Sequence, residues 1–446
     1  MAPTKVVGGP KISARRLMED LHALRRFGAV DFDSSSRGGD GKAKGVCRPA
    51  LTKADLEARG WFAERCREAG LATRIDKIGT TVAKGSSPPG GGKRLLCGSH
   101  SDSQATGGWL DGALGCAYAL ETARAFKDAG LPPAIDVVNF QDEEGRFGTL
   151  TGSGAFCSGG TLDWASPSLS PFEAAPKVTL REAVDLARPD LEAIGADMDL
   201  LLTVDDDDDD ISGFFEAHVE QGRRLERGNR RCAAVSSIVG MRQLRLEAYG
   251  DTNHAGSTLM ADRKDAFRAL LGVVARVDEA FQELAEVAAP NLVWVFSVVD
   301  VAPGAPSIIP SKATCVLQFR DPDDRILDGA RDAVDHLAQR SSSSVPVFVA
   351  DDRPPLRPTR LDPAMVACVE DAVRSHLGPH DSLLAIHSGA VHDAASLANK
   401  AGVPSAMLFV PSINGISHDF TEDTHEDDII TGCQVFADAA ANILRL

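Results

Sequence analysis

Several acidic and histidine side chains in this chain follow short apolar stretches, and they are of the types that bind divalent metal ions. His100 comes directly after the stretch Leu95-Leu96-Cys97-Gly98-Ser99, and Asp102 lies two positions further on. In this spacing the Asp102 carboxylate would orient the His100 imidazole, whose other ring nitrogen would bind metal. Asp111 lies among glycines, which let the backbone approach closely, and its two carboxylate oxygens could bridge a pair of cations.

Two adjacent acids, Glu143 and Glu144, follow the apolar stretch 137–140. Successive side chains of an extended segment point in different directions, so one of the two carboxylates could bind metal while the other faces a polarised water. Hydrolysis needs this division, because a base must take a proton from water whose pKa the metal lowers. His218 and His418 are the remaining candidate ligands. One such residue is more often structural, but five in one chain favour a single hydrolytic metal site.

The elements that must position these residues alternate between strand and helix. Helices are predicted over 53–70, 112–130, 362–377 and from 428 onwards, and strands over 94–99, 134–140 and 405–410. This alternation predicts an α/β sheet, in which sites form at the carboxyl ends of strands. Residues 1–50 contain Gly- and Ser-rich stretches such as 34–41 and are expected to form loops.

The segment 236–352 has a different order of elements. Strands are predicted over 237–249, 291–302, 312–320 and 345–350, with helices over 263–284 and 325–340. This β-α-β-β-α-β order is the split βαβ arrangement, which closes into a compact unit. We therefore expect a domain at 236–352 inserted into a larger α/β domain made of 1–235 and 353–446.

The composition is that of a globular protein and argues against one class of partner. A chain of 446 residues is long enough for two domains. With 47 basic and 64 acidic side chains the net charge is −17, which argues against nucleic acid, since phosphate binding needs a basic face. Six of the acids form the run Asp205–Asp210, expected to be a solvated loop.

The cysteines and the apolar runs bear on location. Nine scattered cysteines without a CxxC pair predict reduced thiols. The N-terminus lacks the apolar core of a signal peptide, and no apolar run is long enough to span a bilayer. We therefore expect a cytoplasmic protein without a membrane partner.

Seven motifs, taken together, resemble the amidase/hydantoinase/carbamoylase branch of the M20 metallopeptidase family, which includes N-carbamoyl-L-amino-acid hydrolases, allantoate amidohydrolases and β-alanine synthases. The motifs are GSHSDS, GGWLDGALG, DEEGRFG, HVEQG, NHAGSTLMADRKDA, HSGAVHDA and GISHDFTE. The resemblance runs from about Gly45 to the C-terminus. It implies a mixed-sheet α/β catalytic domain with an inserted ferredoxin-like lid that also forms a homodimer. It also implies two zinc ions per subunit, or manganese, cobalt or nickel.

The resemblance also assigns the metal ligands. One ion would be held by His100 and His218, and the other by Glu144 and His418. Asp111 would bridge the two ions.

The same resemblance implies roles around the metals. Glu143 would be the general base, and Asp102 would support His100. His254 would reach the substrate carbonyl, and Arg320 would bind a substrate carboxylate, which suits the guanidinium fork.

Further positions match polar residues that line the substrate site in the family. These are Gln221 and His392. A purely structural role in a loop or turn is an equal alternative for both, and for His254.

Three positions depart from the family pattern. Ser307 stands where many relatives have Asn, thirteen positions before Arg320, and Val391 replaces a glycine of SGAGHDA. The motif at Glu143 is one residue shorter than DEEGxRFG. Ser307 and Val391 lie near the expected carboxylate end of the substrate, so they bear on specificity and not on the hydrolytic centre.

These observations predict a metal-dependent hydrolase of a linear amide or ureido bond, with an N-carbamoyl amino acid as the expected substrate class. A dipeptidase or aminoacylase-type activity is the rival on the same scaffold, and HVEQG at His218 favours the carbamoylase branch. A metal-free binding relative is a second rival, against which the five intact ligands argue. A serine hydrolase is unsupported, because no GxSxG elbow is present.

Overall fold

The computed structural model describes residues 9–30, 44–85, 93–170, 173, 177–205, 211–341, 344–377 and 385–446. The chain divides into two compact units. Unit 1 comprises Met1–Ser236 and Arg360–Leu446, and unit 2 comprises Ser237–Thr359. Unit 2 is therefore one continuous segment, whereas unit 1 is built from two segments.

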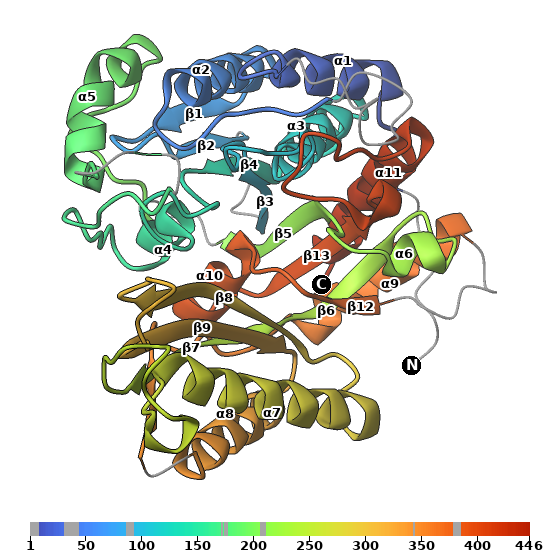
Figure 1. Ribbon diagram of the computed structural model, residues 1–446. Helices are drawn as coiled ribbons and strands as arrows, with labels where there is room; N and C mark the ends of the chain where they lie inside the picture. The colour runs from blue at the N-terminus through green and yellow to red at the C-terminus, as the bar shows by residue number, and fades with distance from the viewer. Residues whose placement is uncertain are drawn as a thin grey trace. The chain divides into compact units, whose positions relative to one another are not determined.

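Unit 1 contains, in its described residues, a nine-stranded mixed sheet of order β1-β2-β4-β3-β5-β13-β6-β11, with β12 pairing β6 (Figure 1). Its strands are β1 (Ala72–Ile75), β2 (Thr81–Lys84), β3 (Arg94–His100), β4 (Ile135–Phe140), β5 (Ile211–Val219), β6 (Ala233–Ile238), β11 (Thr359–Arg360), β12 (Ala385–Ser388) and β13 (Ser405–Val410). The central strands β4, β3, β5 and β13 are parallel to one another. Every residue of β3, β4 and β13 is buried, as expected for parallel strands covered on both faces.

The helices of unit 1 surround this sheet. They are α1 (Ala14–Arg25), α2 (Lys53–Glu68), α3 (Ala113–Asp128), α4 (Thr151–Cys157), α5 (Leu180–Ala193), α6 (Arg224–Arg227), α9 (Pro363–Leu377), α10 (Asp393–Lys400) and α11 (Glu426–Ile443). Helix α3 packs tightly on the sheet, because a Cβ at Gly115 would lie 2.4 Å from the Ala217 carbonyl oxygen and 2.7 Å from the Ser99 Cβ. No helix in the described part of the chain is long and apolar enough to cross a membrane.

Most predicted elements around the candidate ligands are confirmed. The predicted helices correspond to α2, α3, α9 and α11, and the predicted strands to β3, β4 and β13. The prediction that residues 1–50 form loops is wrong for α1. Ser13 caps this helix by accepting from the Arg16 N–H, and Leu17, Leu21 and Leu24 are buried on one face. The stretch 34–41 lies outside the described residues.

Unit 2 is built on a four-stranded antiparallel sheet of order β10-β7-β9-β8. Its elements follow the order β7 (Gly240–Tyr249), α7 (Ala266–Val287), β8 (Val293–Ala302), β9 (Lys312–Asp321), α8 (Asp324–Gln339) and β10 (Val347–Asp351). Residues such as Leu246, Phe281 and Phe319 form one buried core between the sheet and the two helices. The order is the predicted β-α-β-β-α-β (Figure 1).

One strand prediction is wrong at the start of this segment. A single strand was expected over 237–249, but β6 ends at Ile238 and pairs in the large sheet, while β7 begins at Gly240 in the small sheet. A Cβ at Gly240 would lie 2.6 Å from the Pro358 Cδ, so the chain passes closely here. Hydrophobic alternation alone does not reveal that two successive strands belong to different sheets.

Candidate metal centre

The candidate ligands lie at the carboxyl ends of neighbouring parallel strands. His100 is the last residue of β3, and His218 is next to the last in β5. Glu144 follows the end of β4, and His418 lies in the loop after β13. Because β4, β3, β5 and β13 are parallel neighbours, their carboxyl ends lie at one edge of the sheet. Topology therefore gathers residues that are more than 300 positions apart in sequence.

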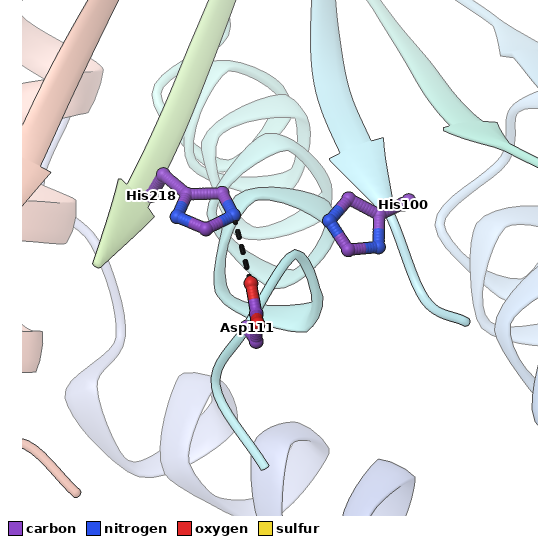
Figure 2. Close-up of side chains that lie close together, drawn as sticks. All are labelled: His100, Asp111 and His218. Atoms are coloured by element: carbon purple, nitrogen blue, oxygen red, sulfur yellow. Dashed lines mark ion pairs between the residues drawn. The ribbon is translucent and has the colours of Figure 1, made fainter. Parts of the chain in front are cut away.

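Two groups of ligand-type side chains meet at this edge, and Asp111 belongs to both. The groups are His100, Asp111 and His218, and Asp111, Glu144 and His418, with the ligand atoms of each group within 4.8 Å of one another. Figure 2 shows the first group, with Asp111 beside His218 and His100 facing them from the neighbouring strand.

The two carboxylate oxygens of Asp111 face different histidines. Its Oδ1 lies 3.1 Å from the Nε2 of His218, and its Oδ2 lies 3.3 Å from the Nε2 of His418. The His418 Nε2 also lies 3.4 Å from the Glu144 Oε2. This is the arrangement that a carboxylate needs to bridge two cations.

Backbone carbonyls fix the tautomers of two histidines. The Nδ1 of His100 lies 3.0 Å from the Asp102 carbonyl oxygen, and the Nδ1 of His218 lies 2.9 Å from the Val219 carbonyl oxygen. A carbonyl oxygen only accepts, so each Nδ1 carries a hydrogen and each Nε2 is the ring nitrogen that could bind a metal ion.

Asp102 supports the site differently from the expectation. Its carboxylate lies 3.8 Å from the His100 Nδ1, further away than its own carbonyl oxygen. The carboxylate instead accepts from the backbone N–H groups of Glu143 (3.5 Å) and Glu144 (3.3 Å) and from Arg59 (3.3 Å). Asp102 thus orients His100 through its backbone, because the side chain is drawn to the loop after β4.

Asp142 turns that loop so that the two glutamates enter the site. It has a φ of 55°, in the left-handed region. Its carboxylate accepts from the N–H groups of Arg146 (2.6 Å) and Phe147 (3.0 Å) and from the Thr151 hydroxyl (2.6 Å). These hydrogen bonds stabilise a conformation that is unfavourable for a residue with a Cβ.

Glycine is required at one position beside His100. Gly112 has a φ of 64°, and a Cβ there would lie 2.4 Å from the His100 Nε2. The motif around Asp111 therefore contains a glycine because the ligand of the neighbouring strand occupies that space.

The acids of the centre are crowded in a buried setting. Burial, with the charges of Asp393 and Glu144, raises the pKa of Glu143 well above its usual value. Burial and the charge of Asp111 raise the pKa of Glu144 to about 8. Burial lowers the pKa of His100 to about 3. Buried carboxylates next to imidazole nitrogens with available lone pairs are a donor set that fits divalent metal ions.

Asp111 changes the proton affinity of the other two histidines. Burial would lower the pKa of His218, but hydrogen bonding and attraction to Asp111 raise it to about 9. The pKa of His418 is raised to about 9 in the same way, with Glu144 contributing. Metal binding at these nitrogens must therefore displace protons, so it is expected to weaken as pH falls.

Two further candidates lie beside the ligands in unit 1. The Gln221 Nε2 lies 3.4 Å from the Asp111 Oδ2 and 3.4 Å from the His418 Nε2. His392 is buried, its ring centroid is 4.5 Å from that of His218, and its Nε2 lies 2.9 Å from the Ser388 hydroxyl. Burial holds the pKa of His392 well below its usual value, so this side chain is neutral. Val391, next to it, is half-buried.

Three candidates belong to unit 2. His254 is exposed, and its Nδ1 accepts from the N–H groups of Gly256 and Ser257, both at 3.1 Å. The Ser307 carbonyl accepts from the Ala255 N–H at 2.9 Å, so Ser307 is a neighbour of the His254 turn.

Arg320 lies in β9. Its guanidinium donates to the Gln318 Oε1 at 3.1 and 2.9 Å. Burial lowers the pKa of Arg320 from its usual value.

Two buried acids beside the centre were given no role from the sequence. Glu422 accepts from the Asp111 N–H, and Asp393 has no hydrogen-bond partner for either carboxylate oxygen among the described residues. Both occur inside recognised motifs, GISHDFTE and HSGAVHDA. An acid directly after a candidate histidine, or four positions after one, is the signal that could have marked them.

The fold and the two ligand groups are those of a metal-dependent hydrolase, and comparison with known proteins identifies the family. The profile of "Peptidase family M20/M25/M40" matches residues 97–442. The solved structure of an amidase of the hydantoinase/carbamoylase family from Burkholderia phymatum is 34% identical, covers 98% of this chain and 99% of its own, and superposes with a TM-score of 0.81.

Two relatives with named activities match nearly the whole length of this chain. An N-carbamoyl-L-amino-acid amidohydrolase from Rhizobium meliloti is 30% identical over 95% of both chains. An allantoate amidohydrolase from Escherichia coli K12 is 29% identical over 90% of this chain and 94% of its own. The chain belongs to peptidase family M20/M25/M40.

Proposed function

We propose that this chain is an amidohydrolase that uses two divalent metal ions to cleave a linear C–N amide or ureido bond. The proposed substrate is an N-carbamoyl amino acid or a similar ureido acid. The observation that carries the proposal is Asp111, shared by two ligand groups. The substrate class is supported by relatives named as N-carbamoyl-L-amino-acid and allantoate amidohydrolases.

The metal assignment follows from the two groups. His100 and His218 would hold one ion, Glu144 and His418 the other, and Asp111 would bridge them, since its oxygens face different histidines. Zinc suits imidazole and carboxylate ligands, and manganese, cobalt or nickel suits the same set. Bound ions would lower the pKa of a water molecule and polarise the substrate carbonyl.

Glu143 is the proposed general base. Its Oε2 lies 3.7 Å from the His100 Nε2, so the carboxylate borders the ligand cluster without belonging to either group. Burial and neighbouring acids raise its pKa, which favours taking a proton, and nearby cations would lower that pKa towards the working range. Glu143 would take the proton of the attacking water and return it to the leaving nitrogen.

Unit 1 is the proposed catalytic domain, and unit 2 is the proposed lid. The sheet order of unit 2 is that of a ferredoxin-like domain. In the lid, the His254 Nδ1 accepts two backbone hydrogens, so its own hydrogen is on Nε2 and could stabilise a developing oxyanion.

The lid would also hold the acid group of the substrate. Gln318 orients the guanidinium of Arg320, which would bind the substrate carboxylate through its fork. Ser307 and Val391 would border this end of the substrate, and Gln221 and His392 would line the site beside the metals.

Unit 2 also supports a proposed homodimer. Strand β8 pairs with β9 and forms an edge of the sheet among the described strands. Val293 and Val295, two positions apart, are 54% and 51% exposed on this edge. An exposed apolar edge strand is suited to pairing with a second copy. Sedimentation of wild type and V295K would test this, with a shift to monomer expected for the variant.

A cytoplasmic location is part of the proposal. All nine cysteines lie in the described part of the chain, and each is unpaired there. Unpaired thiols are typical of a reducing compartment.

A substrate panel tests the function most directly. Purified protein would be given N-carbamoyl amino acids, N-carbamoyl-β-alanine, allantoate and dipeptides, and ammonia or amine release would be measured. We expect turnover of a ureido acid that a chelator abolishes and zinc, manganese or cobalt restores. Turnover of dipeptides alone would favour the dipeptidase rival, and a protein that binds no metal and turns nothing over would be a binding relative.

A further inference from the structure

One buried carboxylate joins two loops that carry proposed metal ligands. One loop belongs to the N-terminal segment of unit 1 and the other to its C-terminal segment. The first loop contains Asp111 and precedes α3, and the second contains His418 and precedes α11. Glu422 is fully buried between them. It is assigned to neither ligand group.

Each oxygen of Glu422 bonds to a different ligand loop. Its Oε1 accepts from the Asp111 N–H at 3.1 Å, and its Oε2 accepts from the Ser417 hydroxyl at 2.7 Å. Ser417 directly precedes His418. The space for the carboxylate depends on Gly108, because a Cβ there would lie 2.0 Å from the Glu422 Oε1.

The same contacts determine how Gln221 is turned. The Ser417 hydroxyl donates its one hydrogen to the Glu422 Oε2, and it accepts from the Gln221 Nε2 at 3.1 Å. The Asp111 carboxylate, 3.4 Å from the same nitrogen, is also an acceptor. The amide nitrogen of Gln221 therefore faces the centre. Its Oε1 is buried and has no hydrogen-bond partner among the described residues.

His418 depends on its loop more than the other histidines do. His100 and His218 lie within strands, and each donates from Nδ1 to a nearby backbone carbonyl. His418 lies in a loop, its side chain is 49% exposed, and its φ of 55° is in the left-handed region. Such a conformation persists only where surrounding contacts hold it. Two contacts do so: Thr106 donates to the His418 carbonyl at 3.1 Å, and Glu422 anchors Ser417.

We propose that Glu422 is a positioning residue of the metal centre, which sets the spacing between Asp111 and His418 through the Asp111 N–H and the Ser417 hydroxyl. His418 is a proposed ligand of one ion, whereas Asp111 is shared by both, so the removal of Glu422 weakens mainly the ion that Asp111, Glu144 and His418 would hold. The inference rests on the proposed two-metal centre. Residues that hold metal ligands in place contribute about 10–100-fold to metal affinity.

The test is a titration of metal-free protein with Co²⁺, followed by calorimetry and by the visible absorption of bound cobalt. In E422Q the amide oxygen can still accept from the Asp111 N–H, but the amide nitrogen then faces the Ser417 hydroxyl, which loses the carboxylate acceptor to which it donates. We expect one of the two ions to bind E422Q about 10–100-fold more weakly than it binds wild type, and the other to bind with a nearly unchanged affinity. S417A should weaken the same ion to a smaller extent, and S417T, which keeps the hydroxyl, should restore its affinity.

The control is the same substitution at another buried carboxylate of unit 1. Asp76 is buried and accepts from the N–H groups of Ile78 (3.1 Å), Thr80 (2.9 Å) and Leu202 (3.2 Å). D76N should lower the melting temperature but leave both cobalt affinities unchanged. This separates a positioning effect from a general loss of stability.

The outcomes distinguish this inference from the proposed function. If folded E422Q binds both ions with wild-type affinity, the role of Glu422 is overturned and the two-metal centre is left intact. If E422Q does not fold, wild-type affinities in S417A overturn it instead. A wild-type protein that binds fewer than two ions would contradict the metal centre itself.

Discussion

Two histidine ligands of unit 1 and two candidate substrate residues of unit 2 are held in different ways. His100 and His218 are buried at strand ends, and their tautomers are fixed by backbone carbonyls. His254 and Ser307 are exposed and lie in turns. A metal centre needs ligands held in advance at fixed spacing, because the ions demand a defined geometry. Groups that act on a substrate can remain exposed until the substrate is bound.

The comparison predicts that changes at the ligands and the proposed base of unit 1 alter metal binding or the proton-transfer step. Changes at the candidate substrate residues His254, Arg320 and Val391, which lie in unit 2 except for Val391, should alter turnover or substrate selection with both metals in place. Four variants test this separation, each with metal content measured beside kcat and KM.

The largest effect is expected for the proposed base. E143Q should lower kcat by about 10²–10⁴-fold, because an amide cannot accept the proton of the attacking water. Its metal content should stay at the wild-type level, since Glu143 belongs to neither ligand group. E143D keeps the carboxylate on a side chain that is one methylene group shorter, and it should retain more activity than E143Q. Near-normal turnover of E143Q would disprove the base assignment.

The next effect concerns unit 2, the proposed lid. H254A should lower kcat by about 10²–10³-fold through the loss of a hydrogen-bond donor to the oxyanion. Metal content and melting temperature should be unchanged, because the side chain is exposed. A change confined to KM would show instead that His254 only binds the substrate.

Arg320 should act on binding. R320K should raise KM by about 10–100-fold, because lysine cannot reproduce a two-pronged hydrogen bond to a carboxylate. R245K is the matched control, since Arg245 pairs with Asp352 in the same unit. The effect should disappear with a substrate analogue that lacks the carboxylate. If it persists there, Arg320 does not bind that group.

The smallest effect is expected at Val391. V391G should change the ratio of kcat/KM between substrates with large and small side chains by about tenfold, which is the scale of an apolar pocket contact. The hydrolytic centre should be untouched. An unchanged preference across a series of N-carbamoyl amino acids would show that Val391 does not line the substrate site.

The local sequence was sufficient to predict those helices and strands whose burial pattern is visible within a single segment. The buried runs of β3, β4 and β13 were predicted, as was α2 from the spacing of Leu56, Phe62 and Cys66, because apolar runs and helical spacing report burial directly. Helix α1 was overlooked although Leu17, Leu21 and Leu24 have helical spacing, because the Gly- and Ser-rich stretch beyond it suggested loops. The break between β6 and β7 could not be predicted, since it depends on which sheet each strand joins.

The sequence by itself determined the types of side chain in the candidate site and showed that several of them follow apolar strands. This was enough to predict a site, because the carboxyl ends of parallel strands are where α/β sheets form their sites. Only the tertiary structure decided how Asp111 faces both His218 and His418. Likewise, Asp102 meets His100 through its carbonyl, and Glu422 joins the two ligand loops. Hydrogen-bond partners far apart in the chain depend on strand order and loop conformation, which no local pattern specifies.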